Sequence, residues 1–234
     1  MKAKLAPWVP RFRKLADKSY HPERFFKTGP GEYSEGDLFL KIRMPVIRKF
    51  LAENEDTFKE IETCEELLQS EYHEERMLAL LGMVRILEKG WLPSHKVATS
   101  YVTHRQYINN WDLVDCSAPQ ILGAHLLKRK RRGVLYKLAA SESLWDRRIA
   151  VLSTFAFIKE MDFKDTLLLA EKLVEDKEDL MHKAVGWMLR EVGNRDLEPL
   201  REFLEEFHTR MPRVMLRYAI EKLSEKERRK WLRK

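Results

Sequence analysis

The chain has 234 residues, enough for one domain with a substantial core or for two small domains. With 44% hydrophobic and 35% charged residues it is typical of a helical globular protein, and disordered and membrane-spanning classes are excluded. A net charge of +7 favours a polyanionic partner, with nucleic acid ahead of an acidic membrane surface.

The N-terminal region, 1–44, differs from the rest in its high content of proline and glycine. Short helices are predicted at 11–19 and 21–26. The segment 28–37 holds three glycines and a proline, so we expect a turn or a small hairpin at 28–40. Residues 38–43 look extended, and Pro45 begins the next helix.

Residues 45–234 show helical periodicity throughout, without the two-residue alternation of a sheet. We therefore predict an all-α fold. Its expected helices are 45–53, 56–69, 72–89, 94–107, 109–126, 133–141, 144–158, 163–175, 179–193, 196–208, 211–222 and 224–232.

Similar pieces recur along this helical region. If Arg76, Trp111, Arg148, Lys183 and Arg217 are equivalent, the spacings are 35, 37, 35 and 34 residues. A period in the mid-thirties with two helices per repeat indicates a HEAT-like α-solenoid, a curved superhelix of helix pairs. We expect a single domain, 1–234, with repeats from 45 onward and no stable oligomer.

The equivalent helices of such repeats line one surface, where aromatic and basic side chains would alternate. This arrangement suits a nucleic-acid backbone. The alternative is structural, because repeated arginines often form hydrogen-bond ladders between repeats. The run of five Lys and Arg residues at 128–132 has the same two interpretations, a phosphate contact or a solvated loop.

Cysteine and histidine show no metal-ligand spacing, so we expect neither a metal nor a cofactor. Cys64 and Cys116 are far apart, and a disulfide is not expected in the cytoplasm, where we place the protein because no apolar signal core follows the basic N-terminus. Cys116 follows Asp115, so a catalytic thiol is one interpretation and a small buried apolar residue the other.

Three motifs resemble the AlkD family of HEAT-like DNA glycosylases. They are Trp-Asp-x-Val-Asp at 111–115, Leu-Trp-x-x-Arg at 144–148 and Lys-Ala-Val-Gly-Trp-Met-Leu-Arg-Glu at 183–191. Pro45 and Arg48 also match a family pattern, and the resemblance covers nearly the whole chain. It implies removal of 3-methyladenine and 7-methylguanine from duplex DNA by hydrolysis of the N-glycosidic bond, without base flipping.

The resemblance also implies roles for individual residues. Asp115 and Trp111 match the catalytic pair, Arg148 the arginine beside the reacting nucleotide, and Trp187 a second catalytic indole. The predicted DNA-binding residues are Arg43, Arg48, Arg76, Lys183, Arg190, Arg213 and Arg217.

The residues suit this chemistry. A cationic alkylated purine departs as a neutral base, so no general acid is needed, and the sugar becomes an oxocarbenium-like cation. Asp115 could stabilise that cation and orient water, while the indole faces of Trp111 and Trp187 could contribute about 0.5–2 kcal/mol each. Arg148 would hold a flanking phosphate and favour the ionised form of Asp115.

Three departures from the family pattern keep a second hypothesis open. Asn110 stands where one branch has a second Trp, Lys41 where Gly is usual, and the insertion at 28–37 resembles branches that bind branched DNA and excise weakly. The alternative function is therefore a weakly catalytic or non-catalytic binder of branched or damaged DNA. A protein-binding solenoid with a structural arginine ladder is a third.

Overall fold

The computed structural model describes residues 7–233, and the chain divides into two compact units, Met1–Leu113 and Val114–Lys234. Over the described residues the secondary structure is helical, with one isolated parallel bridge between Leu38 and Tyr72 and no strand. The all-α prediction is confirmed. Each unit is described by itself, and the single domain over 1–234 stays a prediction.

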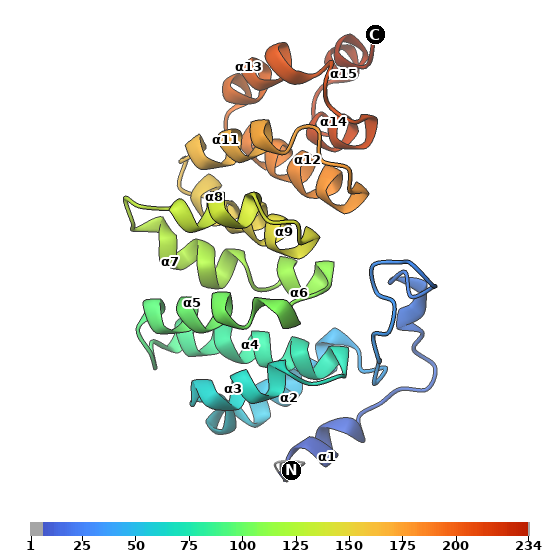
Figure 1. The fold of residues 1–234 in the computed structure, drawn as a ribbon, viewed down its shortest axis with the longest axis vertical. Helices are drawn as coiled ribbons and strands as arrows, with labels where there is room; N and C mark the ends of the chain where they lie inside the picture. The colour runs from blue at the N-terminus through green and yellow to red at the C-terminus, as the bar shows by residue number, and fades with distance from the viewer. Residues whose placement is uncertain (1–6, 234) are drawn as a thin grey trace. The chain divides into compact units, whose positions relative to one another are not determined.

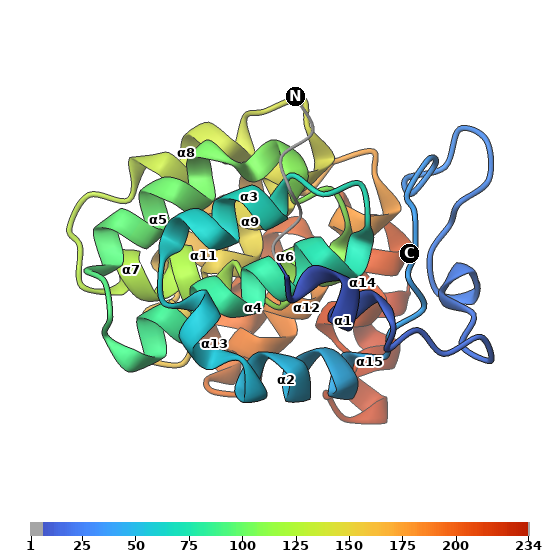
Figure 2. The ribbon, with the colours of Figure 1, turned by 90° about the horizontal axis from the view of Figure 1, so that it is seen from below.

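The first unit is built around the long buried helix α4. Helices α2 and α3 pack against different sides of it, as Figure 2 shows. Its helices are α1 Val9–Arg13, η1 Pro22–Arg24, α2 Met44–Glu53, η2 Glu55–Phe58, α3 Ile61–Leu68, α4 His73–Lys89, α5 Ser94–Thr103 and η3 Arg105–Tyr107. Helix α6, Trp111–Asp115, contains the boundary between the units.

The segment 28–37 forms a series of turns, so the turn is observed of the two expected forms, a turn or a small hairpin. It is fastened to its own unit by polar contacts. Asp37 forms an ion pair with Arg76 at 2.7 Å and accepts a hydrogen bond from Asn110 at 3.1 Å, and Asn110 also donates to Ser34 at 2.5 Å. Because Asn110 is fully buried, these contacts replace solvent for its amide.

The second unit consists of successive helix pairs. Helices α8, α11 and α13 lie on one side of α9, α12 and α14, and within this row α12 packs against both α9 and α14 (Figure 1). The helices are η4 Pro119–Gly123, α7 Ala124–Leu127, α8 Gly133–Ala139, α9 Leu144–Ser153, α10 Phe155–Ile158, α11 Lys164–Lys172, α12 Asp179–Gly193, α13 Leu197–Phe207, α14 Arg213–Ala219 and α15 Glu225–Leu232.

The helix expected at 109–126 is interrupted after Asp115. Pro119 lacks a backbone N–H and cannot continue the α-helical ladder, and the chain winds as a wider π-helix, η4, where Gly123 N donates to Ala118 O at 2.9 Å. A Cβ on Gly123 would lie 2.3 Å from Ser153 O. Glycine therefore permits the close approach of η4 to α9, and Asp115 is left at a helix end.

Three other predicted helices are also divided: 56–69 into η2 and α3, 94–107 into α5 and η3, and 144–158 into α9 and α10, while the helix predicted at 11–19 ends at Arg13. The remaining predicted helices match the observed ones to within a few residues at their ends. Ser143 caps α9 by accepting a hydrogen bond from Asp146 N, and Asp196 caps α13 in the same manner. Between residues 7 and 233, no helix has the length and apolar character needed to span a bilayer.

Candidate active site

The repeats meet in a register that differs by one residue from the sequence alignment. Arg76 donates to the carbonyls of Ser70 and Glu71, at 3.0 and 3.2 Å. Arg147 makes the same two bonds to the carbonyls six and five residues before itself, at 3.1 and 2.7 Å. Arg76 is thus equivalent to Arg147, and the expected equivalence with Arg148 is wrong by one position.

In the corrected register, the fifth residues of five helices are equivalent positions. This equivalence follows from where the helices start, and the bonds of Arg76 and Arg147 establish it for α4 and α9. In chain order these residues are Met77, Asp115, Arg148, Lys183 and Arg217. The first member is apolar, and the last four, all in the second unit, are charged.

Asp115 and Arg148 form a bidentate pair on two helices of the second unit. Arg148 Nε donates to Asp115 Oδ1 and its Nη2 donates to Oδ2, both at 2.8 Å. The remaining Nη1 donates to the carbonyl of Leu180, at the start of α12, at 2.6 Å. The guanidinium is therefore held from two directions, and its planar fork fixes the plane of the carboxylate.

The exposure of the two side chains differs. Arg148 is 5% exposed, whereas Asp115 keeps 16% of its side chain accessible. Arg148 is thus committed to Asp115 and Leu180, which argues against the expected phosphate contact and makes it a residue that positions Asp115. The carboxylate retains an accessible edge that could meet a solvent molecule or a developing positive charge.

The two indoles lie in different units. Trp187 is half-buried on α12, two helical turns or about 10 Å after Leu180, with its ring centroid 6.0 Å from that of Phe155. Trp111, also half-buried, begins α6 one turn before Asp115, and its ring lies 5.5 Å from that of Phe26 in the first unit. Neither indole is sealed in a core.

In the second unit, the predicted DNA-binding cations are accessible to different degrees. Arg217 is exposed and makes no ion pair with any described residue. Arg213 is exposed and donates to Leu232 O at 3.1 Å, and Lys183 pairs with Asp179 at 2.6 Å. Arg190 pairs with Glu221, and its charge lowers the pKa of that carboxyl.

In the first unit two of the predicted DNA-binding cations are exposed and one is buried. Arg48 is exposed and has no ion pair among the described residues, and Arg43 is half exposed beside Asp17, at 3.1 Å. Arg76 is 6% exposed in its pair with Asp37. We therefore remove Arg76 from the predicted DNA-binding residues, because its guanidinium is buried in the ion pair that holds the turn segment 28–37.

The sequence did not predict two contacts near the candidate residues. The carbonyl of Leu180 holds Arg148, and no sequence signal marks a backbone acceptor of this kind. His73 lies 2.9 Å from Asp112 through Nε2, a pair 39 residues apart in the chain. Sequence patterns act over a few residues, so they do not indicate a pair whose members are this far apart in the chain.

The two thiols differ in burial. Burial raises the pKa of Cys64 to about 12, so its thiol is inert, and Cys116 is half-buried. Within residues 7–233, His, Cys, Asp and Glu form no group that could hold a metal ion.

Comparisons with known proteins identify the family and the fold. A sequence profile for the family described as "DNA alkylation repair enzyme" matches residues 12–223. A solved structure described as a predicted DNA alkylation repair enzyme from Enterococcus faecalis has the same fold, with a TM-score of 0.65 and 16% identity, over 82% of this chain and 92% of that one. No curated protein matches the chain. The match over nearly the whole chain shows that it belongs to the DNA alkylation repair enzyme family.

Proposed function

We propose that the protein is a monofunctional DNA glycosylase that removes cationic N-alkylated purines, 3-methyladenine and 7-methylguanine, from duplex DNA. The observation that carries this proposal is the carboxylate of Asp115, held in a fixed plane by Arg148 and still partly exposed. Its partner is double-stranded DNA, and it acts as a monomer in the cytoplasm, without a cofactor and without base flipping.

The chemistry needs one carboxylate. The alkylated purine already carries a positive charge, so cleavage of the N-glycosidic bond releases it neutral and leaves the cation on the sugar. Asp115 stabilises that cation and orients the attacking water, taking up its proton. The guanidinium of Arg148 prevents the carboxylate from rotating away, so the electrostatic stabilisation is in place before the bond breaks.

The indoles contribute through their faces. Trp187, half-buried two turns along α12 from the Leu180 anchor, packs against the sugar in this proposal and stabilises its developing charge. Trp111 does the same from the first turn of α6. The exposed Arg217 and Arg213, with Lys183 and Arg190, bind flanking phosphates and give the affinity its salt dependence.

The test is release of 7-methylguanine and 3-methyladenine from methylated duplex DNA by wild type and by Asp115→Asn. Removing the charge while keeping the shape should lower the single-turnover rate by about 10²–10³-fold. Asp176→Asn is the matched control, because Asp176 pairs with the neighbouring Arg147 at 2.7 Å in the same unit. Equal rates for wild type and Asp115→Asn would refute the mechanism.

Two further outcomes follow from the same chemistry. Neutral lesions lack the built-in leaving group, so DNA containing hypoxanthine should be cleaved poorly. Because Asp115 acts on water and no lysine forms a Schiff base, borohydride should trap no covalent adduct with DNA.

The second candidate function is binding of branched DNA with weak excision. The turn segment 28–37 favours it, since Asp37 and Ser34 hold this insertion on Asn110, the residue directly before α6. Competition between a four-way junction and a linear duplex in gel shifts distinguishes the two functions. A strong junction preference together with absent base release would favour the second.

A further inference from the structure

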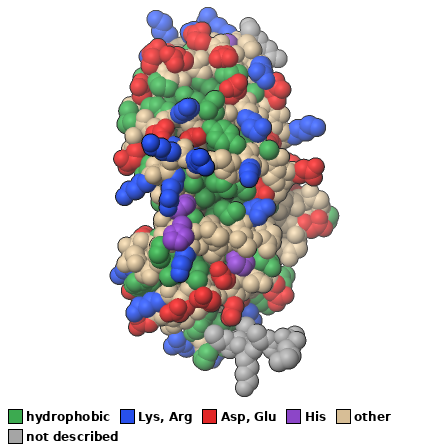
Figure 3. Space-filling model, turned by 60° about the vertical axis from the view of Figure 1, so that its left-hand side comes forward, with side chains coloured by type: hydrophobic (Ala, Val, Ile, Leu, Met, Phe, Trp, Pro, Cys, Tyr) green, Lys and Arg blue, Asp and Glu red, His purple; other side chains and the backbone are tan. Residues whose placement is uncertain are grey.

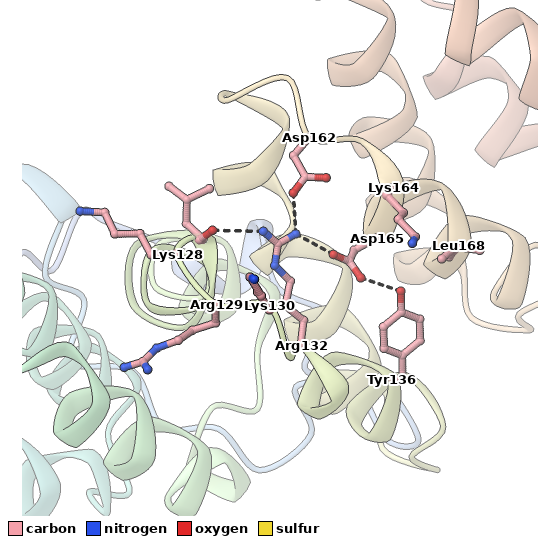
Figure 4. Close-up of a pocket in the computed structure, with 10 residues that line it drawn as sticks. Lys128, Arg129, Lys130, Arg132, Tyr136, Asp162, Lys164, Asp165 and Leu168 are labelled. Carbon is pink, nitrogen blue, oxygen red and sulfur yellow. Dashed lines mark hydrogen bonds and ion pairs between the residues drawn. The ribbon is translucent and has the colours of Figure 1, made fainter.

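The loop 128–132, between α7 and α8, consists entirely of lysine and arginine. It borders an open cavity of about 710 Å³ in the second unit, which five cations and two carboxylates line together with Leu127, Tyr136 and Leu168 (Figure 4). A cavity of this volume is large enough for part of a nucleic-acid strand or a small ligand.

Arg132 anchors the loop from its C-terminal end. Its Nη1 donates to Asp162 at 2.6 Å and to Asp165 at 2.7 Å, and its other nitrogens donate to the carbonyls of Leu126 and Leu127 at 3.2 and 3.1 Å. The guanidinium also lies 3.9 Å from the ring centroid of Phe157. Arg132 thus holds both carboxylates in place, and the five cations and two carboxylates of the lining leave an excess of three positive charges.

The floor of the cavity is fixed by a second contact to the same carboxylate. Tyr136 Oη donates to Asp165 at 2.6 Å. Burial and this hydrogen bond raise the pKa of Tyr136, so its hydroxyl remains a donor at neutral pH. Its ring stays in place beside the cavity, and the loop is held on a rigid base (Figure 4).

Four cations remain around this base, and we call them the basic loop site: Lys128, Arg129, Lys130 and Lys164. All four are exposed, and none forms an ion pair with the residues that the structure describes. Lys128 and Arg129 point away from the carboxylates that hold Arg132 (Figure 4). On the face shown in Figure 3, Lys and Arg side chains gather at mid-height.

The basic loop site and the Asp115–Arg148 pair are built from different segments of the second unit. The lining of the cavity comes from 127–136 and 162–168. Arg148 lies on α9, and its hydrogen-bond acceptors are Asp115 and Leu180. The basic loop site is therefore distinct from the proposed reaction site.

We propose that the basic loop site binds the phosphodiester backbone of a second DNA segment, distinct from the one at Asp115. The proposal rests on the proposed function only in that a first DNA segment binds near Asp115. The protein then holds two DNA segments at once.

Charge density favours DNA over an acidic protein. A duplex carries one negative charge per about 1.7 Å of its axis, whereas an extended peptide offers at most one carboxylate per about 3.3–3.6 Å. Three neighbouring cations on one fixed loop, with Lys164 opposite, match the denser polyanion. Counterions released from DNA supply the free energy of binding.

The experiment measures bridging of two DNA molecules. Unmethylated duplexes of about 12 base pairs, roughly 40 Å long, carry either a donor or an acceptor dye and are mixed with the full-length protein. Wild type should give energy transfer, because one protein holds one duplex of each kind. The variant Lys128→Ala/Arg129→Ala/Lys130→Ala should lose at least about tenfold of the bridging signal while still binding one duplex.

A matched control removes the same charge from scattered positions. Lys96, Lys172 and Arg228 are exposed on α5, α11 and α15 and have no ion pair among the described residues. Their triple alanine variant should bridge as wild type does. The slope of log affinity against log salt for the second duplex should fall by about 2–3 in the loop variant only.

Other outcomes overturn the proposal. Wild type without bridging, or a loop variant that bridges normally, excludes the second DNA site, and the latter would indicate bridging through a protein dimer. Loss of binding to a poly-glutamate peptide with unchanged DNA bridging would assign the loop to an acidic protein partner. The duplexes are unmethylated and bridging is measured without base release, so failure of the glycosylase proposal is distinguishable from failure of this one.

Discussion

Two arginine–aspartate pairs, one in each unit, show how similar contacts can differ in consequence. Arg76 pairs with Asp37 at 2.7 Å in the first unit, and Arg148 pairs with Asp115 at 2.8 Å in the second. In the first pair the side chains are 6% and 5% exposed; in the second they are 5% and 16% exposed. The arginines are equally buried, and only the carboxylates differ.

The surroundings of the carboxylates explain the difference. Asp37 also accepts hydrogen bonds from Asn110 and Asn109, so its lone pairs are occupied by the protein. Asp115 lies at the end of α6, before the break that Pro119 introduces, and keeps an accessible edge. A partly exposed carboxylate is accessible to a ligand, as the proposed mechanism requires, whereas a carboxylate enclosed by protein donors holds the fold together.

The largest effect on stability should come from Arg76→Ala. It leaves Asp37 buried without its cation, and breaking such a pair lowers the free energy of unfolding by about 3–5 kcal/mol. Arg148→Ala should lower it less, because Asp115 can be hydrated. Urea denaturation at neutral pH measures both.

A double variant sharpens this comparison. Arg76→Ala/Asp37→Ala removes both charges, so it should be more stable than the sum of the two single changes implies. An additive result would show that the pair contributes no coupling, and the description of Asp37 as enclosed would then be wrong.

The next effect concerns catalysis. Arg148→Lys keeps the charge but loses the bidentate fork, so the carboxylate of Asp115 is no longer held in one plane. In the proposed mechanism kcat should fall by about 10–100-fold, with KM nearly unchanged, because substrate binding does not involve this side chain. Base release from methylated DNA under single-turnover and steady-state conditions measures both constants.

Arg147→Lys is the control for that variant. Arg147 is the neighbouring residue and pairs with Asp176, so the change should reduce stability and leave kcat unaltered. If both variants lose activity equally, the loss reports general loosening of α9, and the positioning role of Arg148 fails.

The smallest effect concerns two non-glycine residues with left-handed backbone, one in each unit. Lys41 has φ +64° and Met161 has φ +62°. Lys41→Gly and Met161→Gly should each relieve strain and raise the free energy of unfolding by about 1 kcal/mol, less the entropy that glycine adds to the unfolded chain. Thermal unfolding would show an increase in Tm, and a decrease at Lys41 would mean that its side chain contributes more than the strain.

Lys41 also shows why a sequence departure can be harmless. The family resemblance has glycine here, and the structure retains the left-handed conformation that glycine favours. The flanking N–H groups of Leu40 and Ile42 donate to Glu74 at 2.8 and 3.2 Å, and these bonds hold the strained turn. Asn110, a second departure, is buried and holds the turn segment 28–37, so in this protein the position does not face the surface.

The sequence by itself determined the helical class, most helix positions and the family. These depend on local periodicity, on caps such as Ser143 and on helix-starting prolines such as Pro45, all of which act within a few residues. The candidate site was predicted through motif resemblance, and its residues Asp115, Arg148, Trp111 and Trp187 stay predictions until excision is measured.

Only the tertiary structure decided what those side chains do. The partner of Arg148 is 33 residues away and that of Arg76 is 39 away, and no periodicity specifies such pairs. Arg147 and Arg148 are adjacent, but Arg147 anchors the start of its own helix and Arg148 holds Asp115. A repeat register that is wrong by one residue therefore assigns the wrong role to each. Long-range pairing depends on how helices pack, because burial and hydrogen-bond geometry, more than residue type, determine whether a charged side chain stabilises the fold or remains accessible to a ligand.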